Sequence, residues 1–306
     1  MSSKSRPVSL KRRSDSIMGM AFFGPALVLL TLFLFLPMVL TFIYSFTDYF
    51  ALSPNTTHFV GLENFAKLFG DELFVTSFLN TVKFVVIIVP LQCLGALGLA
   101  LLINKVTYCK KYFKVAFFIP VVMSLAVVST LWMQIYSPEG ILNTLLTNMG
   151  FNPQPFIHSA NQALPSIAIM SAWQGMGYQM IIFLGGLQAI NPALYEAATI
   201  DGANRFQRIW YITIPGIMNM IAIQFVLRVG AVMEGGFDQI FNLYTAPVYD
   251  TGDIIDTYIY RLSFVKSSGV NLGFPTAVGL FKNVINFILL MLANGVTRAL
   301  GQETVL

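Results

Sequence analysis

The sequence predicts an all-α membrane protein whose helices cross the bilayer six times. Only 10% of its 306 residues are charged and 56% are hydrophobic, whereas charged residues make up about 25% of a typical soluble domain. The mean hydropathy is +0.71. Uncharged stretches long enough to cross ~30 Å of hydrocarbon recur along the chain, and lysines and arginines collect in alternate connecting segments. This composition excludes an ordinary soluble enzyme.

The first expected transmembrane helix covers residues 16–47 and follows a basic tail, residues 1–15. No charged residue lies between Ser16 and Thr47, and this run is much longer than the ~7–15-residue apolar core of a secretory signal peptide. No small-residue cleavage site closes the run. We therefore predict a retained helix with its N-terminus in the cytoplasm, the side that basic residues favour.

An acidic, amphipathic segment, residues 48–83, is expected outside the membrane and leads into the second span, residues 84–104. The glycines of this span favour close packing against neighbouring helices. The loop after it is predicted to be cytoplasmic because it is strongly basic. Its lysines are Lys105, Lys110, Lys111 and Lys114. The third span is expected at Val115–Ser137 and the fourth at about Leu164–Leu187.

The last two expected spans each contain a cation. Arg228 lies near the outer end of the fifth span, about 217–233, where a long side chain can reach the interface. Lys282 lies deeper in the sixth span, 274–296, and is expected to face the bundle interior. Both side chains could serve either transport or helix packing. The acidic segment between these spans, 234–272, is expected outside, and the C-terminus in the cytoplasm.

A twenty-residue stretch between the fourth and fifth spans organises the rest of the chain. It reads EAATIDGANRFQRIWYITIP, from Glu196 to Pro215. Proline is favoured in the first turn of a helix, so we expect a short helix to begin near Pro192. Asp201-Gly202 should end it, because glycine tolerates the left-handed backbone common at helix ends. A second helix should follow from Asn204, which predicts a helix-turn-helix on the cytoplasmic side.

This stretch resembles the EAA loop of the membrane subunits of ATP-binding-cassette (ABC) importers. The family pattern is Glu-Ala-Ala, three residues, Gly, nine residues, Ile, one residue, Leu-Pro, and here Ile214 replaces the leucine. The resemblance implies that the loop, residues 191–215, contacts the ATPase through a coupling helix. The implied coupling residues are Glu196, Ala197, Ala198, Asp201, Gly202, Ile212 and Pro215.

The resemblance extends over most of the chain. The core, about 74–300, is similar to type I carbohydrate permeases of the maltose and glycerol-phosphate kind. The segment 234–261 looks like the polysaccharide and complex-oligosaccharide permeases of Gram-positive bacteria and lacks the Thr-Gly-Gly-Gly-Pro run of the commoner sugar permeases. This implies import of an oligosaccharide or polysaccharide fragment across the plasma membrane. The implied partners are a second homologous permease, two ATPase subunits and an extracellular solute-binding protein, in membrane lipid and without nucleic acid.

No enzymatic activity, cofactor or metal site is expected in the chain itself. It contains no Gly-Lys dipeptide, so it has no P-loop to hold nucleotide phosphates, and ATP is expected on the partner subunits. Cys93 and Cys109 lack metal-ligand spacing. An ATPase-independent secondary transporter or channel is the alternative, although no convincing internal repeat is present. An intramembrane enzyme has little support, because no span holds a paired nucleophile and base.

Sugar hydroxyls and apolar sugar faces favour amide and aromatic side chains along a transport path. The expected path residues are Trp173, Gln174, Tyr178, Gln179 and, more weakly, Gln224. Polar residues in bundles also form interhelical hydrogen bonds without touching substrate, and this alternative stays open. The acidic outer segment is expected to meet the binding protein through Asp238, Asp253 and Tyr258. A loop that merely caps the bundle is the alternative.

Overall fold

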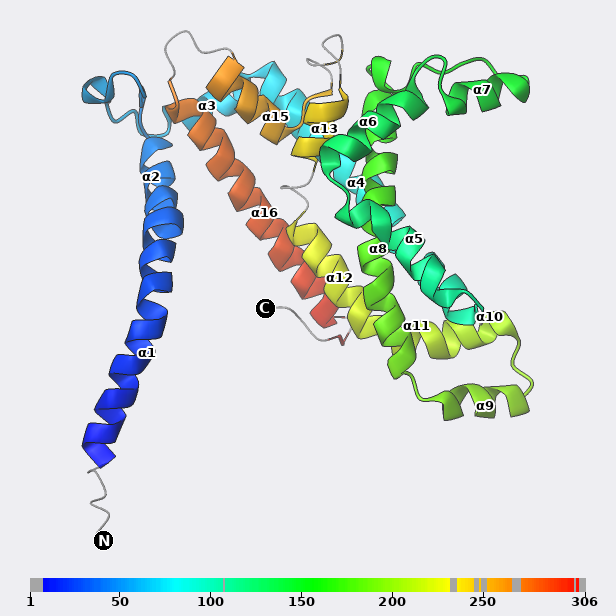
Figure 1. The fold of residues 1–306 in the computed structure, drawn as a ribbon. Coiled ribbons are helices and arrows are strands. Elements are labelled where there is room, and N and C mark those ends of the chain that lie inside the picture. The colour runs from blue at the N-terminus through cyan, green and yellow to red at the C-terminus, as the bar shows by residue number, and fades with distance from the viewer. Residues whose placement is uncertain are drawn as a thin grey trace.

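The computed structural model describes residues 8–106, 108–231, 236–244, 248, 252–265, 271–299 and 301–302, with side chains from residue 18 onward. Most of the described chain is helical (Figure 1). Extended pairing within these ranges is limited to two isolated bridges, Thr47 with Phe59 and Phe50 with Asn271. Four helices are long and apolar enough to cross a membrane, or up to six if each of two bent pairs is one span.

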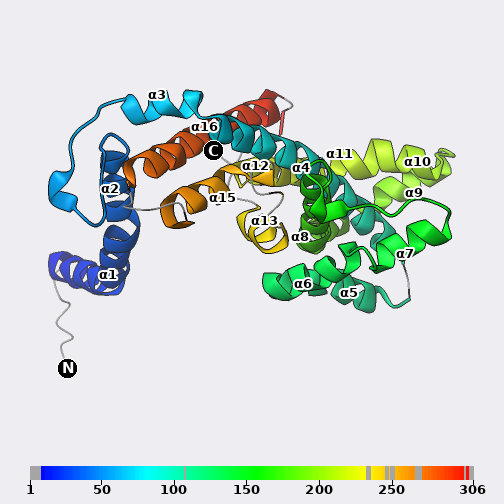
Figure 2. The same cartoon turned by 90° about the horizontal axis from the view of Figure 1, so that it is seen from above.

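The first candidate span stands apart from the other helices. It consists of α1 (Val8–Leu30), a π-helical segment (Thr31–Phe35) and α2 (Leu36–Tyr44). Its apolar window, within Met18–Tyr44, is 0% buried by the rest of the chain. Figures 1 and 2 show it at one side of the molecule, approaching α16 only near α2. A helix that is apolar all round belongs in lipid or against another subunit.

Three further spans are single long helices: α4 (Glu72–Lys105), α8 (Ala163–Ala189) and α16 (Gly273–Ala299). The fourth and sixth expected spans therefore each coincide with a single helix, and the helix at the second expected span is longer than expected. Asp71 caps α4 by accepting hydrogen bonds from the amides of Leu73 and Phe74 at 2.9 and 3.0 Å. The extensive packing of α4 against α8 forms the centre of the bundle.

The expected third span, Val115–Ser137, is not a single straight helix. The chain bends by 101° between α5 (Lys110–Val122) and the helices α6 (Leu125–Tyr136) and α7 (Ile141–Asn148). Met123 and Ser124 have ψ values of 143° and 135°, which interrupt the helix. Apolar composition alone does not reveal such a break, since both sides of it are hydrophobic.

The fifth span is also bent, by 63° at Ile217. Before the bend lie α10 (Arg205–Arg208), a π-helical segment (Ile209–Thr213) and α11 (Ile214–Gly216). After it comes α12 (Met218–Gly230), which is shorter than the expected 217–233. Residues 232–235 lie outside the described residues, as do several others in the expected outer segment 234–272.

Short helices gather at the two ends of the bundle (Figure 1). The upper end in that view holds α6, α7, α3 (Glu63–Gly70), α13 (Phe237–Leu243) and α15 (Ile255–Tyr260). The lower end holds α9 (Pro192–Ile200) and the beginning of α1. Buried apolar clusters lie between α4, α8 and their neighbours along this length.

Candidate functional site

The helix-turn-helix predicted from the sequence is present. Asn191 caps α9 by accepting a hydrogen bond from the amide of Ala193 at 3.0 Å. Gly202 has φ +77°, and its amide and that of Ala203 donate to the carbonyls of Thr199 and Ala198. These two bonds close the C-terminus of α9 in a Schellman motif. The turn thus depends on a left-handed residue at the position where the sequence has glycine.

A capping box begins the second helix of this element. The amide of Gln207 donates to Asn204 Oδ1 at 2.9 Å, and the amide of Asn204 donates to Gln207 Oε1 at 2.7 Å. Two further bonds attach α9 to the helices that follow it. Tyr195 Oη lies 3.0 Å from Thr213 Oγ1, and Arg208 Nη1 donates to Thr199 Oγ1 at 3.0 Å. The element is therefore internally braced.

No residue of α9 is buried in the chain. Leu194 is 52% exposed and Ile200 is 86% exposed, and clustered exposed apolar residues at a helix surface are typical of an interaction site. Glu196 and Asp201 are exposed, and within the described ranges neither forms an ion pair. Ile212 packs against the buried cluster that includes Leu187 and Ile217, whereas Pro215 is exposed in α11. Only the expected coupling residues on α9 and its turn therefore share one exposed surface.

A second candidate site is a polar cavity of about 300 Å³ within the bundle. It lies between α4, α8, α12 and α13, near the bend of α5 into α6. Six of its lining residues are polar: Gln92, Ser171, Gln174, Arg228, Asp238 and Gln239. The expected path residue Gln174 therefore lies at this cavity, and so does Arg228, whose role the sequence left open.

Gln179 connects three helices beside this cavity. It is 0% exposed. With its amide oriented to satisfy both neighbours, Gln179 accepts a hydrogen bond from Arg228 Nε at 2.8 Å and donates to the carbonyl of Gln92 at 3.3 Å. A Cβ at Gly175 would overlap the end of the Gln92 side chain, so glycine leaves room there for this amide between α4 and α8. Gln92 was not among the residues predicted from the sequence, although an amide within an apolar span is a visible signal.

The other expected path residues lie elsewhere. Trp173 packs edge-on against Trp132 at a centroid distance of 5.5 Å and lines a separate cavity of about 250 Å³. Tyr178 is 53% exposed, and Gln224 is buried in α12 without lining either cavity. The five expected residues therefore do not form one site in this chain.

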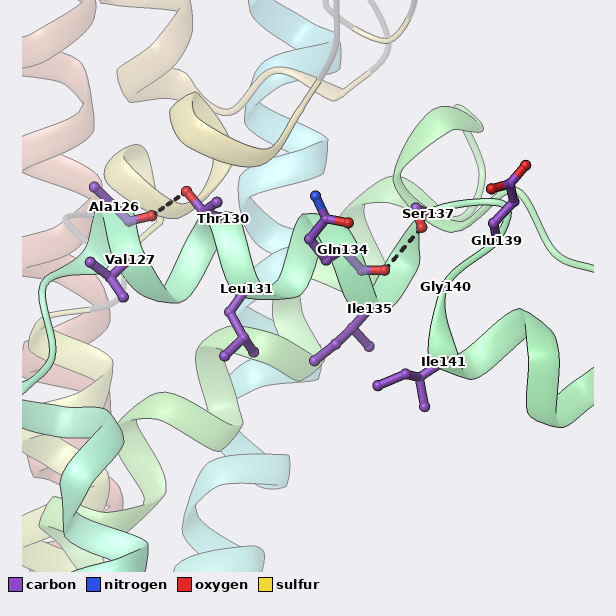
Figure 3. Close-up of a pocket in the computed structure, with 10 residues that line it drawn as sticks. All are labelled: Ala126, Val127, Thr130, Leu131, Gln134, Ile135, Ser137, Glu139, Gly140 and Ile141. Carbon is purple, nitrogen blue, oxygen red and sulfur yellow. Dashed lines mark hydrogen bonds between the residues drawn. The ribbon is translucent and has the colours of Figure 1, made fainter.

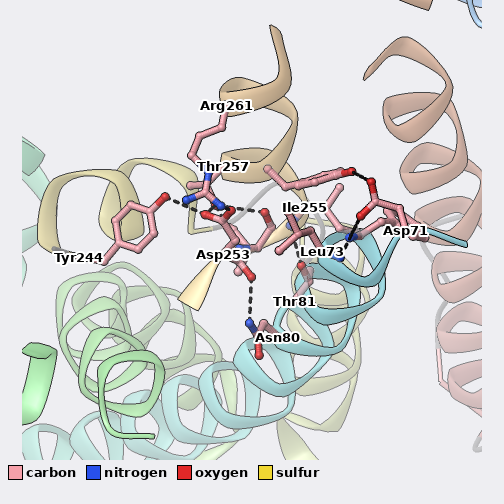
Figure 4. A network of polar contacts seen from close by, with 12 residues as sticks. Asp71, Leu73, Asn80, Thr81, Tyr244, Asp253, Ile255, Thr257 and Arg261 are labelled. Atoms are coloured by element: carbon pink, nitrogen blue, oxygen red, sulfur yellow. Dashed lines mark hydrogen bonds and ion pairs between the residues drawn. The ribbon is translucent and has the colours of Figure 1, made fainter. Parts of the chain in front are cut away.

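The outer segment is held by a buried polar network around Asp253, which is 2% exposed (Figure 4). Tyr244 Oη and Thr257 Oγ1 donate to Asp253 Oδ1 at 2.7 and 3.0 Å, and Arg261 forms an ion pair with the same carboxylate. Asn80 Nδ2 on α4 donates to the backbone oxygen of Asp253 at 3.0 Å. This network joins the outer segment to the beginning of α4.

Tyr258 is likewise internal, at 2% exposure, and donates to Asp71 Oδ2 at 2.8 Å. Burial and the hydrogen bond to the Asp71 carboxylate raise the pKa of Tyr258 above its ordinary value. Two of the three residues expected to contact the binding protein, Asp253 and Tyr258, therefore do not offer exposed side chains in this conformation. A high local content of acidic and aromatic residues does not distinguish a docking surface from a loop anchor. Asp238 is exposed.

Lys282 faces the interior, as expected from its depth in α16. Its Nζ lies 2.6 Å from Oδ1 of Asp256 on α15, and the two side chains are 13% and 17% exposed. Cation and carboxylate thus compensate each other where α16 meets the outer segment. Within the described residues, His, Cys, Asp and Glu side chains form no group of three or more that could hold a metal ion.

Lys282→Met is expected to lower the stability of the chain by about 2 kcal/mol or more, because it leaves the Asp256 carboxylate without its cation. The double variant Lys282→Met with Asp256→Leu should recover much of this loss, since two matched apolar groups replace the pair. Thermal unfolding of the detergent-solubilised complex measures both. Losses that simply add in the double variant would show that the two side chains do not stabilise each other.

A wide cavity of about 970 Å³ lies at the elbow between α6 and α7. Figure 3 shows Leu131, Ile135 and Ile141 pointing to the same side of it. A Cβ at Gly140 would overlap the carbonyl oxygens of Gln134 and Ile135, so the tight elbow requires glycine. The lining is mainly apolar, with Glu139 as its one charged residue. It offers a packing surface rather than a polar site.

Several apolar helices, an exposed helix between two of them and a polar cavity inside the bundle define a membrane-spanning transport subunit. Residues 6–237 match the family of binding-protein-dependent transport system inner membrane components. The chain therefore belongs to this family, which is embedded in the plasma membrane through multiple spans.

Individual relatives are similar over nearly the whole chain. The polygalacturonan/rhamnogalacturonan transport system permease protein YteP of Bacillus subtilis is 30% identical, over 91% of this chain and 87% of its own length. The diacetylchitobiose uptake system permease protein NgcF of Streptomyces coelicolor is 27% identical, over 92% and 82%. A bacterial alginate ABC transporter, solved with a periplasmic protein carrying alginate pentasaccharide, has a chain of TM-score 0.85 and 29% identity, covering 96% of this chain and 99% of that one.

Proposed function

We propose that this chain is a permease subunit of an ATP-driven, binding-protein-dependent importer of an oligosaccharide or polysaccharide fragment. The observation that carries the proposal is the braced but unburied helix α9, set in a chain whose relatives are carbohydrate permeases. An exposed helix with apolar residues, placed between two spans, can dock on an ATPase subunit and follow its movement. The chain itself supplies no catalytic group. ATP hydrolysis belongs to separate ATPase subunits, and the importer also requires a second permease and an extracellular solute-binding protein.

The proposed topology has six crossings with both termini in the cytoplasm. The two bent pairs then count as the third and fifth crossings. Figure 1 places the beginning of α1 and α9 toward the same end of the molecule, and the basic loop before α5 belongs to that end. Positive charge favours the cytoplasmic side. The upper end, with α7, α13 and α15, then faces outward, and the exposed residue Asp238 lies near the surface that receives the binding protein.

In this proposal α9 transmits ATPase movement to the spans as a rigid body. The bonds from Tyr195 to Thr213 and from Arg208 to Thr199 carry displacement into the π-helical segment before the bend at Ile217. Before the first turn of α9, Ile190 packs closely against Gly216 of α11. A Cβ on Gly216 would lie only 2.9 Å from the Ile190 side chain. The ends of α8 and α12 therefore move together with α9.

The sugar path is proposed to run beside Gln174 and Gln179 of α8. Trp173 and Tyr178 lie on the same helix, and both are more than a third exposed. In this proposal the second permease supplies the other side of the path next to them. Aromatic faces and amides are the groups that contact sugars. Gln224 is assigned to helix packing, because it is buried away from the cavity.

Copurification tests the proposal directly. A tagged chain expressed with its second permease is expected to retain an ATPase, and Leu194→Arg on α9 should reduce that retention by about tenfold or more, as loss of an interface anchor does. Leu145→Arg on α7 is the matched control, because Leu145 and Leu194 are each 52% exposed and lie at opposite ends of the bundle. It should keep the ATPase.

Equal loss of the ATPase in both leucine variants would refute α9 as the docking helix. Uptake of glycan by vesicles that contain the chain but no ATPase would instead support a secondary transporter or channel. Retention of the ATPase with normal uptake in Leu194→Arg would also contradict the proposal.

A further inference from the structure

The geometry points to Arg228 as a subsite for the carboxylate of an acidic saccharide, so that the glycan imported is one that carries uronate groups. This inference rests on the proposed transport function and narrows its substrate class. It concerns the cavity of about 300 Å³ between α4, α8, α12 and α13.

The first observation is the placement of the guanidinium. Arg228 lies in the apolar helix α12 and lines the cavity, where a charge is costly and is kept for a function or a partner. Within the described part of the chain it forms no ion pair with a carboxylate. Its Nε is directed at Gln179 at 2.8 Å. The amide fixes one edge of the guanidinium, and no carboxylate of the described residues forms an ion pair with it.

The second observation is the surroundings of the other edge. Arg228 Nη2 lies 3.4 Å from where a Cβ on Gly175 would be, and the Gln92 side-chain amide lies over the same glycine. Gly175, Gln92 and Arg228 all line the cavity, so Nη2 lies at the cavity wall beside an amide and not beside a carboxylate. A guanidinium held by Nε presents its remaining N–H groups as a planar fork, which matches the two oxygens of a carboxylate.

The third observation is a polar side chain that no described residue satisfies. Ser171 is 5% exposed, its hydroxyl has no hydrogen-bond partner among the residues that the structure describes, and it lines the cavity with Gln174. A buried hydroxyl without a partner is costly, which indicates a ligand group that completes it. The hydroxyls of a sugar ring form hydrogen bonds with protein hydroxyl and amide groups such as these. A cavity near 300 Å³ is at the small end of the ~300–1,000 Å³ range of ligand sites, so it suits one sugar unit of a longer chain.

The carboxylate of Asp238 lines the same cavity and would repel an anion bound there. Asp238 is exposed and belongs to α13, and no ion pair joins it to Arg228. Its charge is screened by solvent, whereas Arg228 is held by a buried amide. Asp238→Asn is therefore expected to strengthen binding of an acidic saccharide.

The test compares two ligands of nearly equal shape on the complete complex of permeases and ATPases in lipid nanodiscs. Equilibrium binding of labelled trigalacturonate and of its trimethyl ester is measured without the binding protein, so that receptor selectivity does not enter. The wild-type complex is expected to prefer trigalacturonate by about tenfold or more, the effect of one charged hydrogen-bonded contact. Arg228→Met should remove the preference, and Arg228→Lys should keep part of it.

Lys282→Met is the matched control, since it removes another cation from a long apolar helix, one that already pairs with Asp256. It should retain the preference even if the total amount of folded complex falls. The inference is overturned if wild type binds both ligands equally or neither, or if Arg228→Met or a folded Arg228→Gln keeps the preference. A stronger affinity for a sulfated trisaccharide than for trigalacturonate would overturn the carboxylate assignment.

The same preparations separate this inference from the proposed function. If the ATPase copurifies and the ligand preference is missing, only the acidic-saccharide subsite is refuted. If the ATPase does not copurify with wild type, the importer assignment itself is refuted.

Discussion

Gly202→Val is expected to reduce ATP-driven uptake by about tenfold or more while the chain still inserts into the membrane. Gly202 has φ +77°, and no heavy atom lies within 4 Å of a Cβ built there. The cost of the substitution therefore comes from backbone strain and not from a steric clash with neighbouring atoms. A β-branched residue in this region costs about 1–3 kcal/mol, which is released if the turn changes and α9 leaves its position. ATP-dependent glycan uptake, normalised to the amount of chain in the membrane, measures the effect.

Gly202→Asn is the control, because asparagine adopts the left-handed conformation far more readily than valine. It should retain most uptake, and Gly202→Ala should fall between the two. Full uptake in Gly202→Val combined with Glu196→Lys would show that this turn and helix do not couple ATP hydrolysis to transport.

Asp253→Ala is expected to destabilise the chain by about 3–5 kcal/mol, the cost of breaking a buried ion pair from one side. Arg261, 11% exposed, would lose the carboxylate that compensates its charge. Tyr244 and Thr257 would lose their shared acceptor at the same time. Thermal unfolding of the solubilised complex should show a much lower midpoint, with the outer segment opening first under limited proteolysis.

Glu139→Ala serves as the control, since Glu139 is exposed at the elbow between α6 and α7 and forms no ion pair within the described ranges. Its effect should stay within about 0.5 kcal/mol. Asp253→Asn should be intermediate, because it keeps an acceptor for Tyr244 but loses the charge. Equal midpoints for Asp253→Ala and Glu139→Ala would show that the network does not stabilise the outer segment.

Much of the α9 element was predictable because its signals are local. Pro192, Gly202 and Asn204 act through the backbone within one turn of their own positions, so the helix begins, ends and restarts where the sequence indicates. The limits of α8 were predictable for a similar reason, since polar turns bound an uncharged apolar run. The exposure of Leu194 and Ile200, by contrast, depends on what the rest of the chain leaves uncovered.

The membrane class, the apolar spans and the helix-turn-helix between the fourth and fifth of them could all be predicted before the fold was known. These follow from composition, charge distribution and residues that control backbone conformation over a few positions. The break at Met123, the burial of Asp253 and the hydrogen bonds by which Gln179 joins Arg228 to Gln92 became visible only in the folded bundle. Those features depend on which helix faces pack together, and side chains from distant parts of the chain meet only when the whole bundle forms.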